Sequence, residues 1–240
     1  AIVPLYINYK KGFNSKAMKK LISLMSIFVL SLCLLTGCGS DKKDDKKTEE
    51  TSETTTESTV DNQTATSDDS DELLSGTHHV EINVKDYGTI SVELYADIAP
   101  ITVTNFINLA KSGFYDGLTF HRIIDGFMIQ GGDPNGNGTG GSDQTITGEF
   151  AENGHKENNI SHVRGTISMA RAQDYNSASS QFFIVQSDSD FLDGQYAGFG
   201  TVTDGMDIVD QICKDAVPID NNGTIESSAQ PVITSVTVID

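Results

Sequence analysis

The stretch FHRIIDGFMIQGGD, residues 120–133, decides how this sequence is interpreted. Two polar side chains, Arg122 and Gln130, interrupt a run that is otherwise dominated by apolar residues. An arginine among Phe, Ile and Met is costly to bury unless its head group faces a binding groove or a partner. A solvent-facing arginine on an edge strand is the simpler explanation, and the rest of the sequence has to decide between the two.

Two further clusters follow at a distance along the chain. The first is SMARA at 168–172 with SSQFFI at 179–184, and the second is FLDGQYAGFG at 191–200. Taken singly, their aromatic and aliphatic residues suit the core of any sheet protein. Together with Arg122 and Gln130 they favour a binding groove.

Apolar spacing around these clusters predicts a mainly β fold. Residues 80–84 and 90–94 alternate apolar with polar side chains, which predicts a hairpin with its turn at 85–88. Pro100 begins a helix that Gly113 ends. A second helix is predicted over Gly205–Cys213, with Asp204 as its N-cap. The remaining predicted strands are 119–124, 128–130, 165–170, 181–186, 198–202 and 232–239. Short strands, two helices and Gly-rich joints indicate a closed or nearly closed β-barrel with helical caps.

Composition excludes several classes of function. The net charge is −18, so we expect repulsion from phosphate backbones and no nucleic-acid partner. Three cysteines exclude a disulfide-rich scaffold. The sequence holds no G-x-S-x-G elbow, P-loop, dinucleotide fingerprint or H-E-x-x-H motif. We therefore expect no cofactor.

Metal sites are not expected either. His78 and His79 are adjacent, so on a strand they face opposite sides and do not readily share a metal. The segment 133–138 matches the opening half of a calcium loop, but Gln144 stands where that loop needs Glu. We interpret this segment as a Gly-rich turn.

Residues 1–37 resemble a secretory signal peptide. Residues 1–38 carry five lysines and no acid, and an uncharged run of 15 residues, 21–35, follows Lys19 and Lys20. We take Met18 as the start and residues 1–17 as an upstream extension. The sequence LTGC at 35–38 resembles the lipobox of bacterial lipoproteins, which implies diacylglycerol on Cys38. The alternative is an ordinary signal in which Cys38 is an unmodified apolar residue.

Residues 38–76 read as a disordered tether after the lipidated cysteine. Within 39–76 there are fourteen Ser or Thr residues, twelve acids and four lysines, and no aromatic residue. Such a stretch buries too little apolar surface to offset its ordering entropy. Residues 77–240 then form one domain with a net charge of −15.

The three clusters, in this order and spacing, resemble the cyclophilin family of peptidyl-prolyl isomerases over about residues 80–240. The resemblance implies a closed eight-stranded antiparallel β-barrel capped by two α-helices. It also implies catalysis of cis–trans rotation about X–Pro bonds in proline-containing polypeptides.

The resemblance assigns roles to matching residues. The catalytic arginine falls on Arg122. The substrate-binding positions, which include the proline-ring pocket, two groove glutamines, the Gly-rich rim and a main-chain pairing segment, fall on His121, Phe127, Met128, Gln130, Gly138, Ala170, Arg171, Ala172, Gln181, Phe183, Phe191, Leu192 and Tyr196.

Three positions depart from the common family pattern. Arg171 replaces an Asn whose family contacts are largely through the backbone, so activity should survive while sequence preference changes. Phe191 replaces a Trp and so lacks an indole N–H, which predicts weak binding of cyclosporin. Tyr196 replaces a His.

The residue types suit the reaction. Rotation about a peptide bond has a barrier of ~18–20 kcal/mol because the nitrogen lone pair is delocalised. No bond is made or broken, so the site only has to bind the twisted amide better than either planar form. The twisted prolyl nitrogen accepts a hydrogen bond, and an always-charged guanidinium is a suitable donor.

From the sequence we expect a monomeric isomerase for exported proteins, outside the cytoplasm and lipid-anchored through Cys38 to the bacterial cell membrane. One rival is a binding module that holds a proline-containing partner without turnover. Another is a general holdase, which the charge of −15 on residues 77–240 disfavours.

Overall fold

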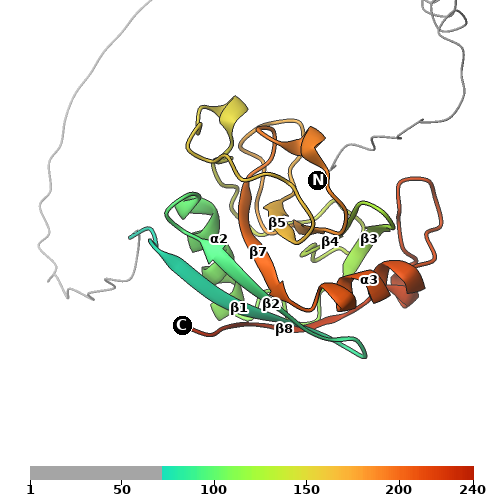
Figure 1. The fold of residues 1–240 in the computed structure, drawn as a ribbon. Coiled ribbons are helices and arrows are strands. Elements are labelled where there is room, and N and C mark those ends of the chain that lie inside the picture. The colour runs from blue at the N-terminus through green and yellow to red at the C-terminus, as the bar shows by residue number, and fades with distance from the viewer. Residues whose placement is uncertain (1–71) are drawn as a thin grey trace, which may run out of the picture. The chain divides into compact units, whose positions relative to one another are not determined.

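Eight antiparallel strands form one sheet in residues 72–240, the part of the chain that the computed structural model describes (Figure 1). The strands are β1 Thr77–Val84, β2 Gly88–Tyr95, β3 Phe120–Ile124, β4 Met128–Gly131, β5 Thr166–Met169, β6 Phe182–Val185, β7 Gly198–Asp204 and β8 Ile233–Val238. Their order across the sheet is β3-β4-β6-β5-β7-β2-β1-β8. The predicted mainly β fold and the β1–β2 hairpin are confirmed.

The sheet curls strongly, and its two edge strands approach each other without a continuous ladder. The edges are β3 and β8. Isolated bridges join Thr119 to Val232 and Arg122 to Thr224, and the Phe120 N–H donates to the Pro231 carbonyl at 2.9 Å. The barrel is therefore open in its strand pairing, with the chain just before β8 lying along β3.

Two α-helices accompany the sheet within residues 72–240, as predicted. Helix α2 spans Pro100–Lys111, and α3 spans Met206–Asp215. The Glu149 carboxylate accepts hydrogen bonds from the N–H groups of Ile101 (3.0 Å) and Thr102 (2.7 Å) at the start of α2. Neither helix within residues 72–240 is both long and apolar enough to cross a bilayer.

The predicted N-cap of α3 is wrong. Asp204 ends strand β7, where it is paired with Ser91, and the helix is preceded by Gly205. Gly205 has φ 93°, and a Cβ there would lie 2.7 Å from the Thr89 carbonyl oxygen. A close approach of the β7–α3 junction to β2 therefore decides this helix start, rather than side-chain capping.

The main core lies between α2 and the inner face of the sheet. Phe106 of α2 packs against Tyr115 and Phe182, with ring centroids 5.0 and 5.5 Å apart. All three side chains are fully buried. Leu74 also packs on this core and its N–H donates to Thr104 Oγ1 at 2.9 Å, so domain contacts begin before Thr77. The predicted signal peptide, Cys38 and most of the predicted tether lie outside the described residues.

Candidate active site

Arg122 lies buried on strand β3 with its guanidinium at the start of a polar row. It is 4% exposed. Its Nε donates to the Asn222 carbonyl at 2.8 Å, and its Nη1 donates to Gln130 Oε1 at 3.0 Å. The row continues from Gln130 Nε2 to Gln181 Oε1 at 2.9 Å, and from Gln181 Nε2 to the Gly140 carbonyl at 2.7 Å.

Strand pairing explains this row. Arg122 is opposite Gln130 in the β3–β4 register, and β4 pairs with β6, which Gln181 precedes. The sequence predicted all three side chains as site residues, and the structure brings them together. Asn222 was not predicted, because it acts through its backbone carbonyl and no side-chain motif marks it.

The third guanidinium nitrogen of Arg122 has no hydrogen-bond partner among the described residues. Its Nη2 is buried and forms no hydrogen bond within residues 72–240. Burial lowers the pKa of Arg122 to about 10, although Tyr196 and Asp220 act in the opposite direction. The side chain therefore stays charged at neutral pH and keeps one donor nitrogen that no acceptor within residues 72–240 uses.

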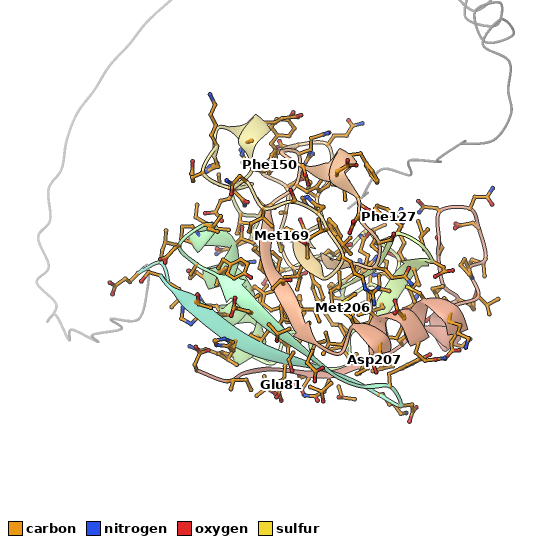
Figure 2. All side chains as sticks on the ribbon, in the orientation of Figure 1. Glu81, Phe127, Phe150, Met169, Met206 and Asp207 are labelled. Carbon is orange, nitrogen blue, oxygen red and sulfur yellow. The ribbon has the colours of Figure 1, made fainter. Side chains whose placement is uncertain are left out.

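A second buried cluster of apolar residues is separate from the main core. Its members are Phe127, Met128, Ala170, Phe183, Val185, Leu192 and Tyr196, with Ile124 and Phe191 packed against it. The predicted proline-ring residues all belong to it. Figure 2 shows Phe127 on the side of the domain away from Glu81 on β1. Phe127 and Tyr196, 8% and 6% exposed, are the buried members that retain some contact with solvent.

A histidine that sequence reasoning missed supports this cluster. The His162 ring stacks on Phe183 with centroids 6.0 Å apart and an interplanar angle of 17°. Its Nδ1 lies 2.9 Å from Asp193 Oδ1, and its Nε2 lies 3.0 Å from Ser168 Oγ. Ser168 is fully buried, so this trio holds the pocket wall and does not present a nucleophile. Asp193 follows Leu192 in the third motif, which was the available signal.

The Arg171 side chain turns into an aromatic cage. Its guanidinium carbon lies 5.0 Å from the ring centroid of Phe150, 4.8 Å from that of Tyr175 and 4.7 Å from that of Tyr196. Its Nε and Nη2 both donate to the Gln195 carbonyl, at 3.1 and 2.9 Å. The side chain is thus engaged with the protein itself.

The main chain of the predicted pairing segment is partly used. The Ala170 N–H donates to the Gln181 carbonyl at 2.9 Å, and the Ala172 N–H donates to Ser177 Oγ at 2.9 Å. The main-chain N–H and C=O of Arg171 form no hydrogen bond among the described residues. These two groups are able to pair with an extended peptide.

The Gly-rich rim is shaped by Asp133. Its Oδ1 accepts from the Asn135 N–H at 2.8 Å, and its Oδ2 accepts from the N–H groups of Asn137 and Gly138 at 3.0 and 2.5 Å. Burial opposes the charge of Asp133, but these backbone donors outweigh it and lower its pKa. Both oxygens of the residue that suggested a calcium loop are therefore engaged by the rim. Among residues 72–240 no group of three or more ligating side chains is positioned to hold a metal.

His121 lies beside this rim. It is 3% exposed, and neither ring nitrogen has a hydrogen-bond partner within the described part of the chain. Burial lowers the pKa of His121 to about 4, with Asp133 acting in the opposite direction. The imidazole is neutral at physiological pH.

Comparison with known proteins gives a consistent result. The family model of the cyclophilin type peptidyl-prolyl cis-trans isomerases matches residues 79–238. A Helicobacter pylori peptidyl-prolyl cis-trans isomerase is 43% identical over 149 residues, covering 61% of this chain and 88% of the relative. Bacillus subtilis peptidyl-prolyl cis-trans isomerase B is 48% identical over 124 residues, covering 52% of this chain and 82% of the relative.

A solved structure agrees. The Cryptosporidium parvum cyclophilin type peptidyl-prolyl cis-trans isomerase, crystallised in the presence of the dipeptide Ala-Pro, superposes with a TM-score of 0.59. It is 32% identical, and the match covers 68% of this chain and 99% of that structure.

Proposed function

This chain belongs to the cyclophilin-type peptidyl-prolyl cis-trans isomerase family, and on that premise we propose that Arg122 catalyses X–Pro rotation during the folding of exported proteins. The family acts on proline-containing peptides. The observation that carries the role of Arg122 is its buried Nη2, which has no protein partner among residues 72–240. A buried charged donor without a partner is costly, and a substrate that accepts its hydrogen bond removes that cost.

Arg122 acts on the twisted amide. In the planar amide the prolyl nitrogen is a poor acceptor because its lone pair is delocalised, whereas at the twisted transition state the lone pair is available. A hydrogen bond from the guanidinium therefore forms more strongly in the transition state than in either ground state. The hydrogen bonds to Asn222 and Gln130 hold the guanidinium in place before the substrate arrives.

The second apolar cluster receives the proline ring. Phe127 and Phe191 lie at its accessible side, with ring centroids 5.6 Å apart. Apolar walls keep the local dielectric low, which strengthens the contact between Arg122 and the amide. Gln130 and the main chain of Arg171 fix the peptide backbone, so that rotation takes place on one side of the bond.

Two further proposals concern an inhibitor and the assembly state of the protein. We propose weak binding of cyclosporin, because Phe191 has no ring N–H to donate. We also propose that the protein acts as a monomer.

The location of the protein is also a proposal. The lipobox-like LTGC at 35–38 supports lipidation of Cys38 and anchoring outside the cytoplasm at the bacterial cell membrane. Labelled fatty acid should be incorporated by the natural chain and not by Cys38→Ala. Equal incorporation in both would refute the anchor.

The isomerase activity is tested directly with the full chain and a short X–Pro peptide. Exchange spectroscopy by NMR measures the cis–trans rate at equilibrium. We expect acceleration far above the uncatalysed exchange, which takes tens to hundreds of seconds. Peptide binding without acceleration would instead support a binding module.

A further inference from the structure

Two aliphatic side chains stand out on the first arm of the loop between α3 and β8. Val217 is 75% exposed and Ile219 is 62% exposed, the highest values among the large apolar residues exposed in residues 72–240. Single exposed apolar side chains are common and need no explanation. These two flank Pro218 and form one apolar patch on a domain whose net charge is −15, so their position is informative.

This apolar patch, Val217 and Ile219, is held beside Arg122. The Ile219 N–H donates to the Thr224 carbonyl at 2.8 Å, and Thr224 forms a bridge with Arg122 of β3. The Arg122 side chain in turn donates to the Asn222 carbonyl at 2.8 Å. Figure 1 shows the loop that leaves α3 standing next to β3.

The loop is built to keep this shape. Asp220 Oδ1 accepts hydrogen bonds from the N–H groups of Asn222 and Thr224 at 2.9 and 3.0 Å. Gly223 has φ 84°, and a Cβ there would lie 2.6 Å from the Ile123 carbonyl oxygen. A preformed patch loses little entropy when a ligand side chain contacts it.

The polar row that runs from Arg122 through Gln130 and Gln181 to Gly140 ends in open space on one side and beside aliphatic side chains on the other. At one end, Gly140 and Gln181 border an open cavity of about 240 Å³, which Ala170 and Ala172 also line. At the other end, beyond Arg122, lies the loop that carries the apolar patch. A peptide extended along the row meets open space on one side of its proline and aliphatic surface on the other.

We infer that Val217 and Ile219 form a subsite for an apolar side chain on the residue that follows the substrate proline. This rests on the proposed function, since it extends the same substrate path. The carbonyl before proline swings during rotation and needs room, which the cavity at the Gly140 end supplies. The residues after proline then pass Arg122 and reach the apolar patch.

The test compares peptides of the form Ala-Ala-Pro-Y-Ala, in which Y is Leu or its polar near-isostere Asn. The full chain is assayed by NMR exchange at several peptide concentrations, which gives kcat/KM for each peptide. We expect a Leu-over-Asn ratio of about five, as a partly buried Leu side chain implies. In Val217→Ser with Ile219→Ser the ratio falls to about one.

A matched control carries Leu73→Ser and Ile239→Ser, which are 48% and 55% exposed in the natural chain. It should keep the natural ratio. Equal kcat/KM for Leu and Asn in the natural chain, or a ratio that survives in the loop variant, would overturn the subsite and leave the isomerase intact. A chain that distinguishes apolar from polar side chains only at the residue before proline would also overturn the subsite. Absence of catalysis on every peptide would refute both proposals.

Discussion

The Nη1 atom of Arg122 donates a hydrogen bond to the Oε1 atom of Gln130 across the β3–β4 pair, at a distance of 3.0 Å. This contact fixes the guanidinium and orients the Gln130 amide, whose Nε2 then donates to Gln181. A change at Gln130 should therefore be felt at Arg122 even though the arginine itself is intact.

Gln130→Ala should lower kcat/KM for a short X–Pro peptide about tenfold, because a hydrogen bond to a charged group is worth about 1.5–3 kcal/mol and only part is expressed in the transition state. The comparison is Gln211→Ala, which removes an exposed bond to Asp215 and should change nothing. An unaltered kcat/KM in Gln130→Ala would mean that the row has no part in catalysis.

Gly223→Ala should damage both stability and activity. The left-handed φ of 84° costs a non-glycine residue roughly 1–2 kcal/mol, and the close approach of the added Cβ to Ile124 Cγ1 contributes an overpacking cost of about 1–3 kcal/mol. Gly117→Ala has a similar φ of 82° with no atom within 4 Å, so it isolates the backbone cost. Urea unfolding of the two variants separates the terms, and equal losses would refute the packing argument.

His162→Phe should lower the free energy of unfolding by about 1–3 kcal/mol, because Ser168 is left buried without its partner while the ring stack on Phe183 is retained. Activity should fall several-fold because Asp193 and Ser168 no longer hold the ring that stacks on Phe183 in place. His155→Phe is the control, since its 3.3 Å contact with exposed Glu157 is worth little. Natural stability together with natural activity in His162→Phe would contradict this role.

His121 should make the domain less stable in mild acid. Its folded pKa of about 4 lies below the ordinary value of 6.5, so the unfolded state binds the proton more readily as the pH falls. Stability is full above pH 6.5 and is lost progressively down to about pH 4. Between pH 7 and 5 this term amounts to about 2 kcal/mol. His121→Phe should remove that part of the loss in urea titrations, and an identical pH dependence in both proteins would refute it.

Much of the fold followed from local patterns. The alternation in β1 and β2, Pro100 at the start of α2 and the buried runs of β3 to β7 all lie close to their predicted bounds. The start of α3 did not follow, because the contact between Gly205 and Thr89 joins residues far apart in sequence. The ladder gap between β3 and β8 was equally inaccessible, since it depends on the irregular path of the chain before β8.

The site divides in the same way. Arg122 and Gln130 were recognisable because polar side chains in apolar runs need a reason, whereas Gln181 was assigned through the family resemblance. The Asn222 carbonyl leaves no trace in a motif, and its role depends on where a distant loop passes. For Arg171 the sequence predicted a substrate contact through the main chain and gave no place for the side chain. The side chain lies among Phe150, Tyr175 and Tyr196, which are far apart in the sequence.

The most direct test of Arg122 is the cis–trans exchange rate of one X–Pro peptide with the natural full chain, Arg122→Lys and Arg122→Ala. Removing one preorganised donor typically costs about 10²–10³ in rate. We predict a loss of that size in Arg122→Ala and a smaller one in Arg122→Lys, which keeps the charge and loses the fork. Circular dichroism should show all three folded. A folded Arg122→Ala that catalyses exchange at the natural rate would contradict the account.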